Sequence, residues 1–197
     1  YVQFIMDSFL ISMAKRYDVK GKTYFNYPNK YYYTDVGLRN ARLNYRQYDP
    51  GHIMENIIYN ELLQRGYSVD VGVVYDRTNG GKAQKEIDFV VNDADKKIYI
   101  QSAFRMDTEE KKSTELLSLL LAKDFFKKII VRMDIPHSFY DENGVFHCNF
   151  IDLLLGRVEL FWPLGQVNRI PELLSITVQV RHYKSPSFLP DFCTAYP

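Results

Sequence analysis

The sequence has little cysteine and no long apolar run, which excludes several classes of protein. Its 197 residues include two cysteines, Cys148 and Cys193, which form neither a disulfide framework nor metal-ligand spacing. No apolar stretch reaches the roughly 18 residues of a membrane-spanning helix, and no charged-then-apolar leader pattern opens the chain. These absences predict a soluble protein of a reducing, cytoplasmic compartment.

An excess of charge of either sign is also missing. The chain has 25 Lys and Arg against 24 Asp and Glu, and its net charge is +1. This balance excludes a chain-wide electrostatic footprint for nucleic acid. Residues 1–50 alone have a mild basic bias, with eight Lys or Arg against four Asp. If the chain binds nucleic acid, the sequence favours Lys15, Arg16, Lys20 and Lys22 in that segment as the contacting cations.

Aromatic residues, by contrast, are abundant. Sixteen Tyr and 13 Phe bring the aromatic share to 15%, which is typical of half-buried strands in a mixed sheet. The length suffices for one domain, or one and a half, with a sizeable core.

The N-terminal 48 residues are expected to form a helix followed by a basic hairpin. Residues 2–14 place apolar side chains at helical spacing. Lys20, Gly21 and Lys22 form a turn between aromatic and β-branched residues, which predicts a β-hairpin. A helix with a basic hairpin is the second half of a winged helix, so residues 1–48 are predicted to be a partial winged helix. The alternative is a helix and hairpin that only pack on the next domain.

Residues 49–155 carry the clearest pattern of helices and strands. Residues 51–66 predict a helix, and a second helix is predicted from an Asp107 N-cap to about Phe125. Strands are expected at 67–75, 85–92, 97–104 and 127–134, the last internal and parallel to a neighbour, before a strand and short helix within 144–155. The order predicts an α/β (α+β) fold in which helices flank a mixed sheet. Residues 156–197 hold five of the eight prolines and form a tail of unclear structure, with one candidate strand at 174–181.

Several segments together carry a resemblance to a known family. They are "KYYYTDVGLRNARL" (30–43), "GHIMENIIYNELLQRGY" (51–67), "KEIDFVV" (85–91), "KKIYIQSAF" (96–104) and "FIDLLL" (150–155). Through them, residues 1–155 resemble the C-terminal domain of unknown function of bacterial and archaeal AAA-type ATPases. The resemblance implies a restriction-endonuclease-like, PD-(D/E)xK fold at 49–155. It also implies an ATPase module upstream in the same polypeptide, since this chain has no ATP site.

The resemblance places a degenerate nuclease site on four residues. The acid of the first helix maps to Glu55 and the central acid to Asp88, while Gln101 and Ala103 stand where the fold has Glu and Lys. Such sites hold Mg²⁺ through carboxylate oxygens and use the lysine to stabilise developing charge. Mg²⁺ on Glu55 and Asp88 is therefore expected only if the site is active, and no other cofactor is indicated.

Three functional hypotheses follow from this site. The first is a non-catalytic module that binds nucleic acid, such as DNA, or a partner protein. The second is a weak metal-dependent nuclease in which a relocated cation, Arg105, Lys123 or Lys127, replaces the lysine. The third is a structural domain for homo-oligomerisation. The missing Glu and Lys favour the first.

Overall fold

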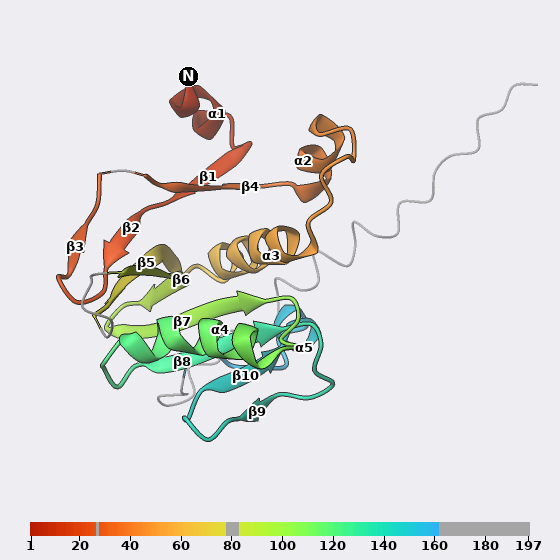
Figure 1. The fold of residues 1–197 in the computed structure, drawn as a ribbon. Coiled ribbons are helices and arrows are strands. Elements are labelled where there is room, and N and C mark those ends of the chain that lie inside the picture. Colours follow the sequence, from red (N-terminus) through yellow and green to blue (C-terminus); the bar gives the residue numbers. More distant parts are fainter. Residues whose placement is uncertain (27, 78–82, 162–197) are drawn as a thin grey trace, which may run out of the picture. The chain divides into compact units, whose positions relative to one another are not determined.

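The computed structural model describes residues 1–26, 28–77 and 83–161 (Figure 1). The helices are α1 (Val2–Asp7), α2 (Val36–Arg42), α3 (Pro50–Gln64), α4 (Glu109–Leu121) and α5 (Phe150–Leu154). The strands are β1 (Ile11–Ala14), β2 (Arg16–Asp18), β3 (Thr23–Tyr24), β4 (Lys30–Tyr33), β5 (Ser68–Asp76), β6 (Ala83–Asp93), β7 (Lys96–Ala103), β8 (Lys127–Arg132), β9 (Phe139–Tyr140) and β10 (Phe146–Asn149).

Eight of the described strands form one mixed sheet, in the order β3-β2-β5-β6-β7-β8-β10-β9. The β5–β6–β7 meander is antiparallel, whereas β8 runs parallel to both β7 and β10. The central strands read as continuous apolar runs because both of their faces are covered. The predicted mixed sheet flanked by helices is confirmed, and so is the internal, parallel strand that begins at Lys127.

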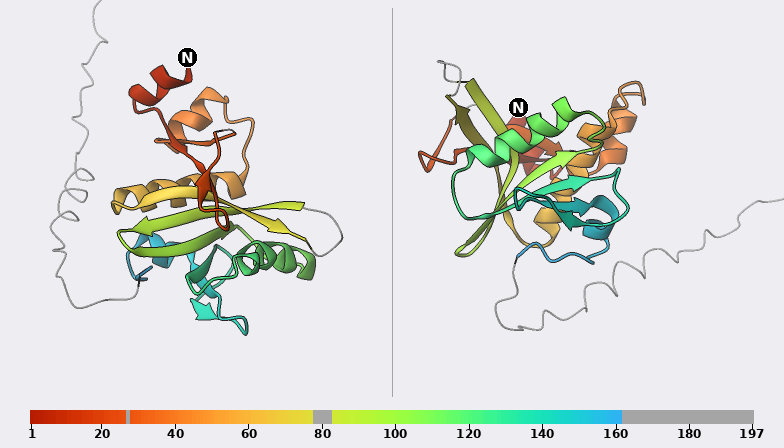
Figure 2. Two further views of the ribbon diagram at one scale, coloured as in Figure 1. Left: turned by 90° about the vertical axis from the view of Figure 1, so that its left-hand side faces the viewer. Right: turned by 60° about the horizontal axis from the view of Figure 1, so that its bottom comes forward.

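The two faces of the sheet have separate apolar cores. On one face, Met54, Ile58 and Leu62 of α3 pack with Phe89 of β6 and with α5. On the other, Leu119 of α4 packs with Tyr99 and Ile130, among others. Figure 2 shows α3 and α4 on opposite sides of the strands. None of the helices in the described part of the chain combines the length and apolar composition needed to cross a bilayer.

The N-terminal helix is much shorter than predicted. It ends at Asp7, and Phe9 adopts a left-handed backbone with φ of 57°. Residues Ile11–Ala14 instead form β1, which pairs antiparallel with β4 in a separate two-stranded sheet. The prediction of a helix over 2–14 was therefore wrong, because strand pairing outweighed helical spacing.

The basic hairpin is present where it was predicted. Strands β2 and β3 pair antiparallel around the Lys20–Gly21–Lys22 turn. The carboxylate of Asp18 accepts hydrogen bonds from the backbone N–H groups of Lys20 and Gly21, at 3.0 and 2.8 Å. An aspartate in this position is a common way to fix a turn.

Helix α4 begins and ends at other residues than expected. Its N-cap is Thr108, whose hydroxyl oxygen accepts from the backbone N–H of Lys111 at 3.2 Å, so the predicted Asp107 cap was wrong. The helix ends at Leu121, four residues before the predicted end. The candidate strand at 174–181 lies outside the described residues.

Candidate functional site

Helix α3 and strand β4 are held together by two asparagines that the sequence analysis missed. The side chain of Asn56 accepts from the backbone N–H of Tyr33 at 2.9 Å and donates to its carbonyl at 2.7 Å. The amide of Asn60 donates to the carbonyls of Tyr33 and Thr34, at 3.0 and 3.1 Å. This clamp sets the position of β4, and therefore of Lys30 and Tyr32, against Glu55.

Lys30 is the centre of a carboxylate cluster drawn from two elements. Its ammonium lies 3.0 Å from Glu55 Oε1, 2.5 Å from Glu86 Oε1 and 3.6 Å from Asp88 Oδ1. Burial disfavours the charge on Lys30, but the negative charges of Asp88, Glu55 and Glu86 outweigh burial and raise its pKa above the ordinary value. The lysine is therefore a fixed positive charge at neutral pH.

Asp88 reaches the cluster through an irregularity in β6. Two residues of β6, Asp88 and Phe89, lie opposite the single residue Val71 of β5, which is the arrangement of a β-bulge. Bulges redirect a side chain locally and are frequent beside functional sites. The Asp88 carboxylate accepts from the backbone N–H of Ser102 at 2.9 Å.

The environment of Asp88 favours its neutral form. Burial and the charge of Glu55 raise the pKa of Asp88 to about 7, although Lys30 and the Ser102 N–H act in the opposite direction. Tyr32 also faces Glu55, to which its hydroxyl donates at 2.7 Å. Burial, and to a smaller extent the charge of Glu55, raises the pKa of this phenol. The negative charge of Glu55 thus acts on both of these neighbouring groups.

Glu86 connects the cluster to the N-terminal hairpin. Its second carboxylate oxygen lies 2.6 Å from Arg16 Nη2. Arg16, predicted as a nucleic-acid contact, therefore forms an ion pair with Glu86. The Arg16 side chain is 20% exposed and the Glu86 side chain 27%. A residue already paired inside the protein is a poor candidate for a phosphate contact.

Gln101 and Ala103 lie on the α4 side of β7, where Gln101 contacts Glu115 and Ala103 joins the apolar core. The Gln101 amide donates to Glu115 Oε2 of α4 at 2.9 Å, and its carbonyl oxygen accepts from the backbone N–H of Asp88 at 3.3 Å. A glutamate at position 101 would have no N–H group to donate to Glu115. Its negative charge would also lie between the carboxylates of Glu115 and Asp88. Ala103 is 2% exposed in the apolar core under α4.

The cations proposed as replacements for the missing lysine lie elsewhere. Arg105 is exposed beyond the end of β7 and lies over the Phe104 ring. The ammonium of Lys127 donates to the carbonyl of Glu159 at 3.4 Å, and Lys123 lines a separate pocket. The cation that reaches Glu55 and Asp88, Lys30, was missed. Strand alternation puts Lys30 and Tyr32 of "KYYY" on one face, which was the available signal.

The cluster does not have the chemistry of a vacant metal site. An ammonium with three donors already lies between the carboxylates that would ligate a divalent cation. Across residues 1–26, 28–77 and 83–161, no group of three or more His, Cys, Asp or Glu side chains is arranged to hold a metal ion.

A pocket of about 640 Å³ opens beside Lys30 and Glu55. It lies between β4 and the segment that joins α2 to α3, and its walls include Tyr31, Tyr48 and Arg46. The other predicted nucleic-acid contacts are outside it. Lys15 lies 6.0 Å from the centre of the Tyr24 ring, and Lys20 and Lys22 line the pocket that also holds Lys123.

The fold and cluster define a mixed α/β domain with a lysine-neutralised carboxylate site, and comparison with known proteins relates this domain to a family. Residues 50–147 match the family described as Domain of unknown function (DUF4143). The chain is also similar to an "Uncharacterized protein" of Haemophilus influenzae (strain ATCC 51907 / DSM 11121 / KW20 / Rd), with 37% identity over 131 residues. That match covers 66% of this chain and 30% of the relative. No solved structure gives a significant match.

Proposed function

We propose that this chain is a catalytically degenerate, nuclease-like binding module, the non-ATPase portion of an AAA-type ATPase polypeptide. Its role is to contact nucleic acid or a partner protein and to couple that contact to the ATPase. The restriction-endonuclease-like character of residues 49–155 and the partial winged helix at 1–48 are parts of this proposal.

The observation that carries the proposal is the ammonium of Lys30 among Glu55, Glu86 and Asp88. A metal-dependent nuclease needs a cation with open coordination positions, which polarises the phosphate and activates a water molecule. An ammonium ion neutralises carboxylates but provides no such position. The cluster therefore keeps the acids of a nuclease site without its chemistry.

The surroundings of Gln101 and Ala103 support the loss of catalysis. Gln101 is 8% exposed and hydrogen-bonded to Glu115, so it is built into the packing as a neutral amide. A lysine in place of Ala103 would bury its charge in an apolar core, which is strongly unfavourable.

The link to an ATPase rests on the family resemblance, and the length of the relative leaves room for such a module. The Haemophilus protein extends well beyond the matched region, which covers 30% of it, and a longer architecture accommodates an ATPase module as intramolecular partner. A DNA ligand, a partner protein or a second copy of the chain are the external partners that this architecture allows.

A second candidate function is a weak metal-dependent nuclease that uses Lys30 as its relocated cation. The specific observation in its favour is that Lys30 lies within 3.6 Å of Asp88 and within 3.0 Å of Glu55. In this hypothesis, Glu55 and Asp88 would hold Mg²⁺, which would polarise the phosphate, and Lys30 would supply the positive charge of the missing lysine.

A cleavage assay separates the two functions. The natural chain, Asp88→Ala and Lys30→Met would each be incubated with supercoiled and single-stranded DNA in Mg²⁺ or Mn²⁺, with EDTA as control and circular dichroism to verify folding. We expect no EDTA-sensitive product from the natural chain. Cleavage that EDTA stops and that both variants lack would overturn the proposal in favour of the second candidate.

A further inference from the structure

We infer that a second pocket, between the β2–β3 hairpin and the C-terminal end of α4, binds single-stranded nucleic acid. We call it the hairpin pocket. The inference rests on the proposed function and names the ligand and its place on the molecule. The pocket measures about 520 Å³ and differs in character from the carboxylate cluster, since its walls are basic.

Five cations from four parts of the chain line the hairpin pocket: Lys20, Lys22, Arg77, Lys97 and Lys123. The acids on its walls are Asp76 and Asp124. The pocket therefore has a net charge of about +3 on a chain whose total is +1. Such a local excess attracts a phosphodiester backbone even though the whole molecule is nearly neutral.

The cations of the hairpin pocket form no ion pair with a carboxylate in the described part of the chain. The Asp124 carboxylate instead interacts with groups outside this set of cations. The Tyr99 hydroxyl donates to it at 2.6 Å, and the Lys128 ammonium lies 3.6 Å away. Lys20, Lys22, Arg77 and Lys123 are exposed. Their charges are consequently available to phosphate groups.

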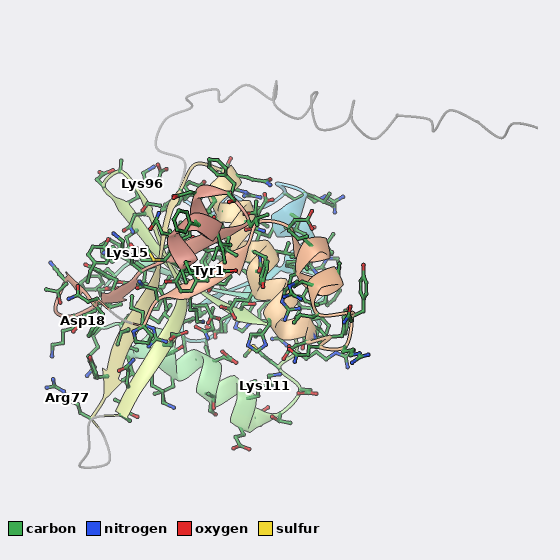
Figure 3. The ribbon with its side chains drawn as sticks, turned by 90° about the horizontal axis from the view of Figure 1, so that it is seen from above. Tyr1, Lys15, Asp18, Arg77, Lys96 and Lys111 are labelled. Carbon is green, nitrogen blue, oxygen red and sulfur yellow. The ribbon has the colours of Figure 1, made fainter. Side chains whose placement is uncertain are left out.

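The turn and the strand ends hold these cations in place. Asp18 fixes the backbone of the turn that carries Lys20 and Lys22. Figure 3 shows Asp18 and Arg77 along the same side of the molecule, whereas Lys111, at the other end of α4, lies away from them. The pocket thus gathers cations that are far apart in sequence on the face of the sheet that α4 covers.

An exposed aromatic ring lines the pocket, and a second exposed ring is next to it in the sequence. Phe126 lines it and is 42% exposed, and its neighbour Phe125 is fully exposed. Lys97 lies between the rings of Tyr17 and Phe126, 4.7 and 5.7 Å from their centres. Exposed rings beside available cations are the combination by which proteins bind single strands, since unstacked bases lie on the rings and phosphates on the cations.

The pocket beside Lys30 is a weaker candidate for the same ligand. Its three Lys and Arg residues, Lys30, Arg39 and Arg46, share its walls with Asp49 and Glu55, which leaves a net charge of about +1 against +3 in the hairpin pocket. In the hairpin pocket, by contrast, Lys20 and Lys22 are exposed, whereas the nearby Arg16 pairs with Glu86.

Fluorescence anisotropy tests the inference with a labelled oligothymidylate of about 20 nucleotides, longer than the roughly 4–16 nucleotides of a single-strand site. We expect salt-dependent binding by the natural chain. In Lys20→Glu/Lys22→Glu, affinity should fall about ten-fold or more, and the slope of log K against log salt should decrease by about 0.7 for each phosphate group that the variant no longer neutralises. Phe126→Ala, which removes a ring that lines the pocket, should weaken binding by about ten-fold at unchanged slope.

The matched control is Arg42→Glu/Arg105→Glu, which reverses two exposed charges outside the pocket. An equal fall in affinity in this control, or no binding by the natural chain, would overturn the inference. Binding of polyglutamate in preference to oligothymidylate would also overturn it and would assign the pocket to an acidic protein. Gels of the same samples with Mg²⁺ report cleavage separately, so a failure of the non-catalytic function is distinguished from a failure of this pocket.

Discussion

At the scale of single residues, the carboxylate cluster depends on one ammonium group. Lys30 is the cation that Glu55 and Asp88 share, and its side chain is 27% exposed. Without it, Glu55 and Asp88 would lose the cation that they share, and Glu86 would be left with Arg16.

We predict that Lys30→Met destabilises the fold. Removing one partner of a buried ion pair costs about 3–5 kcal/mol, and the partial exposure of Lys30 lowers the expected effect to about 2–3 kcal/mol. Urea unfolding at neutral pH measures it. The control is Lys112→Met, whose exposed pair with Glu109 should be worth less than about 1 kcal/mol. Equal destabilisation in the two variants would show that Lys30 is not central.

The raised pKa of Asp88 makes a separate prediction about pH. Since the folded pKa of about 7 lies above the model-peptide value of 3.8, the folded protein binds this proton more tightly than the unfolded chain does. The stabilisation that comes from this bound proton of Asp88 is therefore fully present below about pH 4 and is lost as the pH rises to about 7.

Asp88→Asn removes this titration. Between about pH 4 and pH 7, the natural chain should lose roughly 2–4 kcal/mol of unfolding free energy relative to Asp88→Asn. Each pKa unit corresponds to about 1.4 kcal/mol. Urea titrations of both proteins across this range provide the measurement. A difference that stays constant with pH would mean that Asp88 is not buried as a neutral acid.

At the scale of elements, the bulge of β6 requires a glycine on the neighbouring strand. A Cβ at Gly72 would lie 2.9 Å from both Ile87 Cβ and Val90 Cγ2. Ile87 and Val90 flank the two bulged residues, so the strands approach closely at the place where Asp88 is redirected.

We predict that Gly72→Ala lowers stability by about 1–3 kcal/mol, which is the usual cost of overpacking a core. Thermal unfolding measures the change. Gly51→Ala is a suitable control, because its Cβ would meet only the Asp49 side chain, at 3.3 Å, and alanine favours the first turns of α3. Similar melting temperatures for the natural chain and Gly72→Ala would contradict the close approach.

At the scale of the whole molecule, folding should not require a divalent cation. The positive charge that the carboxylates need comes from the chain itself, through β4. We therefore predict the same melting temperature in Mg²⁺, in Ca²⁺ and in EDTA, measured by calorimetry. A ligand that binds only the folded state raises stability, so a clear rise with Mg²⁺ would indicate a metal site that competes with Lys30.

Apart from the two-residue strand β9, which was missed, the chain's order of helices and strands from Gly51 to Leu155 could be predicted from sequence, because periodicity and turn residues are local signals. The apolar centre of β8 indicated an internal parallel strand, and the structure confirms it. The helix expected over residues 2–14 was wrong for the opposite reason. Pairing of β1 with β4 is a contact between distant residues, and no local pattern contains it.

The candidate site likewise has features that the sequence predicted and features that only the structure shows. Sequence alone singled out Glu55, Asp88, Gln101 and Ala103, and predicted that the last two lack the charges of a nuclease. Only the tertiary structure decided that Lys30 neutralises the acids and that Gln101 turns to Glu115. It also decided that Lys20 and Lys22 meet Lys123 around one pocket. The physical reason is that residue types follow from the sequence directly, whereas burial and the distances between charges arise only when separate strands and helices pack.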